Sequence, residues 1–562
     1  MSFSIEQIPF SRYGSFISIS YLTKRRSGKE GIYFRNIRKG DDRSGAVFKI
    51  DLIEDGQVVP FTARVHPTYL QLKTEKGFMK FVFPEEDYVR FYGENVGLRL
   101  SLVTGYYDNA FRQDEKRWQV NAFSQGMRYM LSPLQGDMHV DADWEVKTST
   151  RVIADFLPQK SDGSVEGIIE EFLVVYEPKT YDSSFEAAHE RVKKLYKDWC
   201  DKTLELSDKY DAGKQLASYI TWSTVVKPEG YLPREAMYMS KNWMTNIWSW
   251  DNCFNAMALA KNNPELAWDQ LMIFFDTQDE SGVLADFIND QFAYWNCSKP
   301  PVHGWTLNWM MERTEFSKEK LEEIYEPLVK WTNWFKNHRT PNSDSLPLYH
   351  HGNDSGWDNS TVFDQGIPVE SPDLPAFLIL QMETLAKIAE KLGKYEESKD
   401  WQTKSEKLLD KMIERFWDGE KFFARYYGER VNVGDSLLLF MPIVLADRLP
   451  KDILKKLIQG LKEEGRFLTD HGLATESQRS PYYIDDGYWR GPIWAPATML
   501  MIDGLVRSGE KEFARELANR FCQMANEYGM AENYDAKTGE GLRDRAFTWT
   551  SSVFLILGHE YC

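Results

Sequence analysis

The sequence predicts a multidomain chain in which an N-terminal antiparallel β-sandwich is followed by an all-α barrel. Short runs of alternating apolar and polar residues recur through residues 1–183, which is typical of strands. Apolar residues then repeat every three or four positions as far as residue 562, which is typical of helices. We place the sandwich at residues 1–183, a helical linker at 184–206 and the barrel at 207–562.

The strand-like runs of the first part are short and are bounded by turn residues. Many short strands with little helix between them favour a sandwich of two sheets. The runs on which this prediction rests are Gly31–Arg35, Gly45–Ile53, Gly77–Phe83, Val96–Val103, Arg151–Leu157 and Gly167–Tyr176.

Helix formers from Phe185 to Leu206 predict the linker helix, with Val192, Leu195 and Trp199 on one apolar stripe. Beyond it, three periodic segments predict long helices, and Gly393 is placed to end the first of them. The helical part is too long for a simple bundle, and it lacks the repeat of fixed length that a solenoid would show. A barrel is therefore predicted. The periodic segments are Leu378–Leu392, Leu454–Leu461 and Phe513–Tyr528.

Composition excludes several classes of function. The net charge is −17 and there is no stripe of Lys and Arg, so we expect no nucleic-acid partner. The five cysteines are scattered and odd in number, which indicates free thiols in a reducing compartment. The N-terminus has no signal-peptide pattern and no apolar run is long enough for a membrane span. We expect a cytoplasmic protein without a membrane partner, and its oligomeric state stays open.

Five loop segments between the predicted helices combine Trp, Gly and acidic residues. Aromatic residues make up 14% of the chain and include 19 Trp, and most of them are explained by core packing. Loops on a rigid scaffold nevertheless carry function more often than cores do, and flat aromatic faces suit sugars. The segments are Trp248–Asn255, Ser298–Trp305, Asn353–Ser360, Asp485–Trp494, and Ala531–Tyr534 with Phe547–Thr550.

Two carboxylates in these loops suit acid–base chemistry. Asp358 follows Trp357, and apolar surroundings favour the protonated form that a general acid needs. Glu532 lies beside Asn533 and Tyr534, where hydrogen bonds would keep a general base ionised. Taken alone, Asp358 also suits a turn or helix cap, and Glu532 suits a helix end.

Three of the motifs together resemble the clan of (α/α)6-barrel glycosidases that includes trehalases, processing α-glucosidase I and the bacterial mannosylglycerate and glucosylglycerate hydrolases. They are Gly356-Trp-Asp-Asn-Ser, Tyr488-Trp-Arg-Gly-Pro-Ile-Trp and Glu532-Asn-Tyr. The resemblance covers residues 240–560. It implies that Asp358 is the general acid and Glu532 the general base of an inverting hydrolase, with carboxyl carbons about 6.5–9.5 Å apart.

The resemblance also implies substrate-binding roles for aromatic and polar loop residues. Trp250 and Asp251 match a pair that lines the glycone subsite, and Lys299 sits where trehalases carry Gln near the leaving group. That difference, and the missing Gly-, Arg- and Phe-rich trehalase motif, make Ser298–Trp305 more similar to the mannosylglycerate hydrolase type. The predicted substrate-binding residues are Trp248, Trp250, Asp251, Asn252, Lys299, His303, Trp305, Trp357, Tyr488, Trp489, Arg490, Trp494 and Trp549.

These observations lead us to expect an exo-acting α-glucosidase on short α-linked oligosaccharides or small glucosides, which needs no metal or other cofactor. A mannosylglycerate or glucosylglycerate hydrolase and a trehalase-like enzyme are the alternatives, although the negative charge argues mildly against an anionic substrate. A disaccharide phosphorylase would need a phosphate site in place of the base, and a non-catalytic sugar-binding protein would not need both carboxylates.

Overall fold

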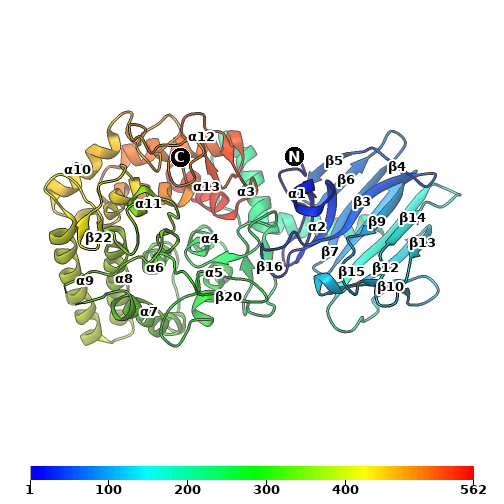
Figure 1. Ribbon diagram of the computed structural model, residues 1–562, viewed down its shortest axis with the longest axis horizontal. Helices are drawn as coiled ribbons and strands as arrows, with labels where there is room; N and C mark the ends of the chain where they lie inside the picture. Colours follow the sequence, from blue (N-terminus) through cyan, green and yellow to red (C-terminus); the bar gives the residue numbers. More distant parts are fainter. Residues whose placement is uncertain (1, 182, 343) are drawn as a thin grey trace. The chain divides into compact units, whose positions relative to one another are not determined.

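The computed structural model describes residues 2–181, 183–342 and 344–562. Contacts divide the chain into two compact units (Figure 1). The first unit comprises Met1–Lys202, Tyr219–Lys227 and Ser240–Thr245. The second comprises Thr203–Ser218, Pro228–Met239 and Asn246–Cys562. The first is built from strands and the second from helices, so the predicted fold class is confirmed.

Two antiparallel sheets make up the sandwich. One has the order β1 (Ile17–Leu22), β2 (Gly31–Asn36), β3 (Ala46–Glu54), β9 (Gly97–Leu102), β14 (Val152–Leu157), β13 (Asp137–Ala142), with β4 (Gln57–Val59) beside β3. The other has the order β10 (Asn109–Arg112), β11 (Trp118–Ala122), β12 (Met127–Gln135), β15 (Ser164–Phe172), β8 (Tyr88–Glu94), β7 (Phe78–Glu85), β6 (Tyr69–Lys73), β5 (Thr62–His66).

Alternating side chains from the two sheets meet in the core of the sandwich. Phe91 of β8 contacts Phe156 of β14 with ring centroids 4.8 Å apart, which joins the sheets across their inner faces. The runs predicted as strands form β2, β3, β7, β9, β14 and β15. The last of them ends at Phe172, four residues earlier than predicted, because the residues that follow are exposed.

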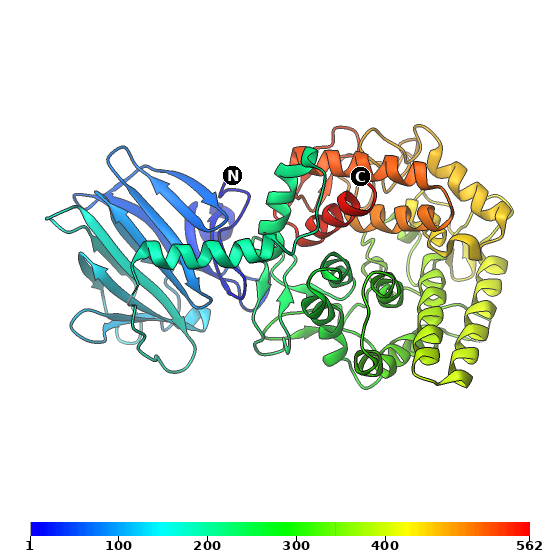
Figure 2. The same ribbon diagram turned by 180° about the vertical axis from the view of Figure 1, so that it is seen from behind.

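The predicted linker helix is α2 (Phe185–Cys200), which ends before the predicted Leu206. It packs on β7 and β8 (Figure 2). The Ser184 side chain accepts a hydrogen bond from the Ala187 amide and caps the N-terminus. Leu195 was predicted on the buried stripe, but it is 44% exposed. The buried stripe is Phe185, Ala188, Val192 and Trp199.

The helical unit alternates inner and outer elements along the chain. The inner ones are α4 (Asp251–Leu259), α6 (His303–Met311), α8 (Asp373–Lys391), η5 (Leu437–Arg448), α11 (Ala495–Arg507) and α13 (Thr548–Glu560). The outer ones are α3 (Asp211–Ser223), α5 (Pro264–Asp276), α7 (Lys318–His338), α9 (Tyr395–Phe416), α10 (Lys451–Lys462) and α12 (Lys511–Tyr528).

The inner elements close a ring. Each packs on the next in the order α4, α6, α8, η5, α11 and α13, and α13 packs back on α4. Helices α4, α6, α11 and α13 are buried almost all round, as expected for elements covered on every side. This arrangement is the (α/α)6 barrel. The predicted helix stop at Gly393 is confirmed, since α8 ends at Lys391 and Gly393 has φ +77°.

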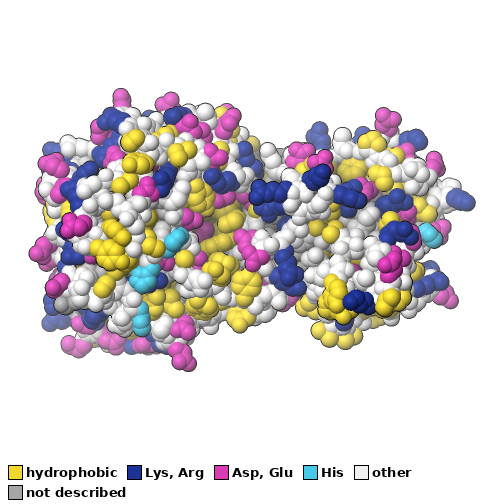
Figure 3. All heavy atoms as spheres, in the orientation of Figure 1, with side chains coloured by type: hydrophobic (Ala, Val, Ile, Leu, Met, Phe, Trp, Pro, Cys, Tyr) yellow, Lys and Arg dark blue, Asp and Glu magenta, His cyan; other side chains and the backbone are white. Residues whose placement is uncertain are grey.

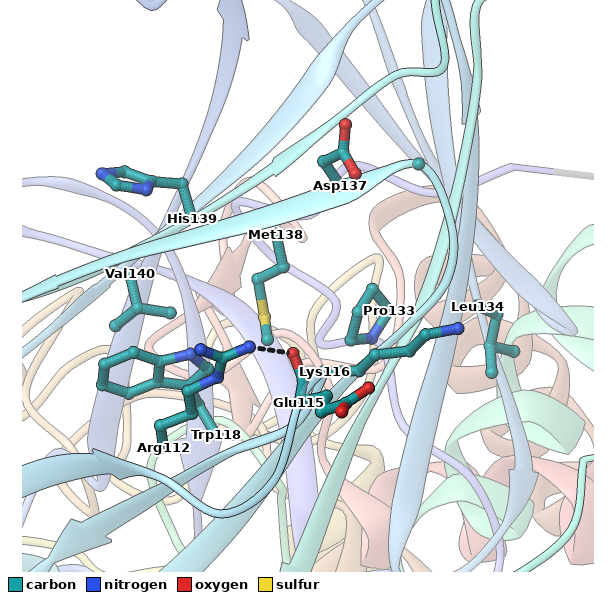
Figure 4. A pocket seen from close by; sticks show the side chains of 11 residues that line it. Arg112, Glu115, Lys116, Trp118, Pro133, Leu134, Asp137, Met138, His139 and Val140 are labelled. Atoms are coloured by element: carbon teal, nitrogen blue, oxygen red, sulfur yellow. Dashed lines mark hydrogen bonds between the residues drawn. The ribbon is translucent and has the colours of Figure 1, made fainter.

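A surface pocket of about 410 Å³ lies in the sandwich, between the β10–β11 hairpin and β13 (Figure 4). Met138 and Val140 point from β13 toward Arg112 and Trp118, whereas His139 points to the opposite side of the strand. None of the predicted site residues lines this pocket. On the face shown in Figure 3, basic side chains are interspersed with acidic ones.

Candidate active site

The five Trp- and Gly-rich loops gather at one end of the barrel. The inner elements alternate with outer helices, so they run in the same direction and begin at the same end of the ring. The loops precede or begin α4, α6, α8, α11 and α13. Segments far apart in the sequence therefore supply side chains to one place.

The loop that carries Asp358 packs tightly on the start of α4. Gly356 has φ +73°, and a Cβ there would lie 2.5 Å from Cζ2 of Trp250, so glycine is required on both counts. Trp357 is buried, and the Asp358 that follows it is half-buried. The local fold thus leaves Asp358 accessible next to a buried indole.

Asn359 joins this loop to the loop before α11. Its Nδ2 donates to the Gly487 carbonyl at 3.0 Å, and its Oδ1 accepts from the Trp489 amide at 3.0 Å. The Arg490 Nε donates to the Asn359 carbonyl at 2.6 Å, and its guanidinium pairs with Asp364. Arg490 therefore fixes the backbone directly after Asp358.

Glu532 lies directly before β24 (Asn533–Tyr534) and is only 6% exposed. Burial raises its pKa to about 7, and the carboxylate of Asp544 adds to this, while Arg543 and a hydrogen bond from Tyr488 oppose it. The expectation that hydrogen bonds keep this carboxylate readily ionised is therefore corrected, because loss of solvent outweighs them.

Tyr488 interacts electrostatically with both predicted catalytic carboxylates. Tyr488 is half-buried, and loss of solvent together with the negative charges of Glu532 and Asp358 holds its pKa well above the usual value. Its backbone lies in the left-handed region at φ +63°, which is unusual for a residue other than glycine. The carbonyl of Tyr488 accepts from the Trp494 indole at 2.9 Å, which fixes this conformation.

A buried cation and three carboxylates form the floor of the cluster. Lys299 Nζ lies 3.2 Å from Asp286 Oδ1 and donates to the Asn353 carbonyl at 3.0 Å. Burial opposes the charge on Lys299, but Asp286, Asp358 and Asp251 outweigh it and raise its pKa. Burial raises the pKa of Asp251 well above its usual value, although Lys299 opposes this. The four side chains are therefore close enough to interact electrostatically.

Five tryptophans from four of the loops form one continuous aromatic wall. Trp489 and Trp494 stack with ring centroids 4.0 Å apart, and Trp357 lies 4.7 Å from Trp489. Trp250 and Trp549 are 5.6 Å apart, and Trp549 is also 5.6 Å from Trp494.

Among the buried polar atoms with no hydrogen-bond partner within the described residues are Asp251 Oδ2, Asn533 Nδ2 and Trp549 Nε1. Such atoms are costly to bury unless water or a ligand satisfies them. The combination of an aromatic wall and unsatisfied polar atoms is what a polar ligand such as a sugar requires.

Three other predicted substrate-binding residues contact neighbouring parts of the barrel. Asn252 is hydrogen-bonded to Gln270 and Asn255 within the helical layers. The Trp305 indole donates to Asp503 of α11 at 2.7 Å. Trp248 is in β18 (Ile247–Trp248) and contacts Phe287 at 5.3 Å. None of these contacts involves Asp358 or Glu532, so substrate binding by these three residues stays a prediction.

His303 likewise lies in the core of the barrel, against Phe275 and Trp331. Burial lowers its pKa to about 3, so it is neutral at physiological pH. The prediction of a sugar contact for His303 has no support from these neighbours. Across the described residues, no group of three or more His, Cys, Asp or Glu side chains is arranged to hold a metal ion. The described helices also include none that is long and apolar enough to cross a bilayer.

Sequence reasoning missed Asp286 and Arg543. Asp286 stands between apolar residues with no motif around it, and only its ion pair with Lys299 reveals it. Arg543 lies in the left-handed region at φ +60°, with its guanidinium 4.8 Å from the Tyr488 ring centroid and paired with Asp486 at 2.6 Å. Asp485 and Asp486 are accordingly exposed ion-pair partners.

Comparison with known proteins assigns the chain to a class. Residues 244–550, more than half of the chain, match the family described as mannosylglycerate hydrolase MGH1-like glycoside hydrolase domain. The chain therefore belongs to this family and is a glycoside hydrolase of the (α/α)6-barrel clan.

Particular relatives support the same class. A mannosylglycerate hydrolase of Rubrobacter radiotolerans is 23% identical over 431 residues, which cover 58% of this chain and 97% of that protein. A glucosylglycerate hydrolase of Mycolicibacterium hassiacum is 24% identical over 407 residues, which cover 55% of this chain and 91% of that protein. A bacterial glucoamylase complexed with acarbose shares the fold over 99% of this chain and 94% of its own, with a TM-score of 0.64 at 11% identity.

Proposed function

We propose that the protein is an inverting hydrolase of α-linked glycosylglycerates, with Asp358 as general acid and Glu532 as general base. The expectation of an α-glucosidase acting on oligosaccharides gives way to its alternative, because the two relatives described above hydrolyse mannosylglycerate and glucosylglycerate. The identity between them and this chain is low, so the glycone is left to experiment.

One observation carries the proposal. Asp358 and Glu532, which are 174 positions apart in the sequence, both act electrostatically on the half-buried Tyr488, and this supports their membership of one site. Asp358 also interacts electrostatically with Lys299 and Asp251. A pair of carboxyl groups across a pocket is the arrangement that glycoside hydrolysis uses.

The chemistry follows from the surroundings of each group. Asp358, half-exposed beside Trp357, donates its proton to the glycosidic oxygen as the bond breaks. Glu532 removes a proton from a water that attacks the anomeric carbon from the opposite face, so an α-glycoside gives a β-sugar and free glycerate. We assign Asp251 Oδ2 and Trp549 Nε1 to hydroxyl groups of the glycone, because neither atom has a hydrogen-bond partner among the described residues.

The competing functions make different demands on these residues. A phosphorylase uses phosphate as the nucleophile and has no need for a buried base such as Glu532. A sugar-binding protein has no need for the buried Glu532, whose ionisation burial makes costly. Phosphate-independent turnover separates the enzyme from both.

The test is hydrolysis of α-linked substrates with NMR detection of the first anomer formed. The panel contains mannosylglycerate, glucosylglycerate, trehalose, kojibiose, nigerose, maltose, isomaltose and sucrose. We expect a glycosylglycerate to be cleaved to the β-sugar without phosphate, and D358N and E532Q each to lose at least about 1,000-fold in kcat. D485N, in an exposed ion pair near the same loop, is the matched control. Initial α-product would contradict inversion, and no cleavage of any substrate would contradict the function.

Substrates with a good leaving group separate the two roles. Such a leaving group needs no proton, so D358N should regain most of its lost rate on a 2,4-dinitrophenyl glycoside, whereas E532Q should not. Recovery by E532Q alone would mean that the two roles are exchanged.

A further inference from the structure

A row of three aromatic side chains leads from the carboxylate cluster to the surface. They lie on one face of the small sheet formed by β18, β19 (Phe287–Ile288) and β20 (Ala293–Tyr294). In the strand register, Trp248 is opposite Phe287, and Phe287 is opposite Tyr294. Directly opposed residues on neighbouring strands project to the same face. This stripe is therefore built by the sheet and does not depend on chance proximity.

The stripe is not the buried face of its sheet. The opposite face carries Ile247 and Ile288, which are fully buried, whereas Trp248 and Phe287 are half-buried. Tyr294 is 42% exposed and the neighbouring Trp295 is 43% exposed. Core packing accounts for the aliphatic face, but it leaves the exposed aromatic residues unexplained.

The outer ring is held in a fixed orientation. Phe287 and Tyr294 stack with ring centroids 4.9 Å apart and planes only 10° apart, so one face of Tyr294 is backed by Phe287. Asn296 Nδ2 donates to the Tyr294 hydroxyl at 3.4 Å. A ring that is fixed before binding loses little entropy when a ligand packs on its free face.

The backbone ties this stripe to the site. The Asp286 amide donates to the Tyr294 carbonyl at 2.8 Å, and the Asp286 carbonyl accepts from the Ser249 amide at 3.0 Å. The carboxylate of Asp286 pairs with Lys299 in the floor of the cluster. The first ring of the stripe, Trp248, stands two residues before Trp250 of the aromatic wall.

We propose that Tyr294, which is backed by Phe287, and the neighbouring exposed Trp295 form an outer subsite for a pyranose ring in an extended leaving group. This inference rests on the proposed function. An exo-acting enzyme holds the glycone at the buried end of its pocket, beside Asp251 and Trp357, so a substrate that reaches the exposed stripe does so with its leaving group. The preferred substrate is then longer than a simple glycosylglycerate and carries a further sugar on the leaving-group side.

The test compares two substrates, namely the glycoside that the wild type accepts and its homologue whose leaving group is longer by one pyranose. We expect the wild type to have a KM several-fold lower for the longer one. Y294A and W295A should reduce that preference at least about fivefold, because one stacking contact is lost. Both residues are exposed, so the variants should fold. Y395A, at an exposed tyrosine that begins α9, is the control and should keep the preference.

A second measurement is independent of turnover. In the D358N background, saturation-transfer NMR should show contact between the protein and the outer pyranose, and Y294A should remove it. Equal KM values for the two substrates, or a preference that both variants retain, would overturn the subsite and leave the hydrolase intact. Failure of the wild type to cleave either substrate would contradict the proposed function itself.

Discussion

At the scale of single residues, the proposed role of Glu532 as general base predicts how the activity depends on pH. A general base works only when ionised, and burial raises the pKa of this carboxyl to about 7. The folded-state pKa lies above the ordinary value, so the ionised fraction falls as the pH drops through about 7. We expect kcat/KM, which reports the ionisation of the free enzyme, to fall about tenfold per pH unit below that point. A rate that stays level down to pH 5 would exclude Glu532 as the base.

Tyr488 lowers the pKa of Glu532, the proposed base. Its hydroxyl donates a hydrogen bond to Glu532 and lowers the pKa that burial raises. Y488F removes the donor, so the acidic limb of the pH profile should move to higher pH. Y482F, at an exposed tyrosine upstream in the same segment, is the control. A uniform loss of activity with an unmoved limb would mean that Tyr488 serves only the shape of the pocket.

At the scale of elements, the loop before α8 depends on one glycine. An alanine at Gly356 would be strained at φ +73° and would place its Cβ 2.5 Å from the Trp250 ring. G393A is a matched control, because Gly393 has φ +77° but a Cβ added there would meet no atom within 4 Å. We expect G393A to cost about 1 kcal/mol in unfolding free energy and G356A at least about twice that. Only G356A should reduce kcat strongly, since it displaces Asp358. Equal effects of G356A and G393A would show that backbone strain causes the losses and that the contact with Trp250 does not.

The elements that the sequence predicted well are those with a one-sided apolar pattern. β3 and β9 have a buried face, and α8 has a clear stop at Gly393. β13 lies at an edge of its sheet, and its side chains alternate between exposed and half-buried, so its sequence has little apolar signal. Leu195 was misplaced for a related reason, because periodicity identifies a stripe but not its exact centre.

The sequence could indicate candidate site residues that stand in a motif, but not residues that only the folding of the chain brings together. The tryptophans of the wall stand in recognisable motifs and their rings contact one another, whereas the roles of Asp358 and Glu532 stay predictions. His303 and Trp305 stand in an equally suggestive segment, yet they lie at the start of α6 and point into the core. Asp286 reaches Lys299 only through folding of the chain, so no local pattern could have identified it.

At the scale of the whole molecule, the barrel depends on its last helix. α13 packs on α4, α11 and α12, and Phe554 of α13 would be 2.6 Å from a Cβ on Gly213 of α3. Deleting residues 547–562 leaves the inner faces of these helices uncovered. We expect the truncated chain to lose the cooperative unfolding transition of the barrel in calorimetry, whereas the intact chain shows it. A truncated chain that keeps this transition would show that the ring is stable while open.

This closure also orders events during synthesis. Asp358, the proposed acid, leaves the ribosome long before Glu532, the proposed base, and α13, which completes the ring, follows Glu532. A nascent chain that is halted before residue 530 lacks Glu532, so with the proposed catalytic pair it can cleave nothing. With this catalytic pair, activity arises in a single late step of synthesis, and we expect a premature stop in the last part of the message to yield inert protein instead of a weakened enzyme.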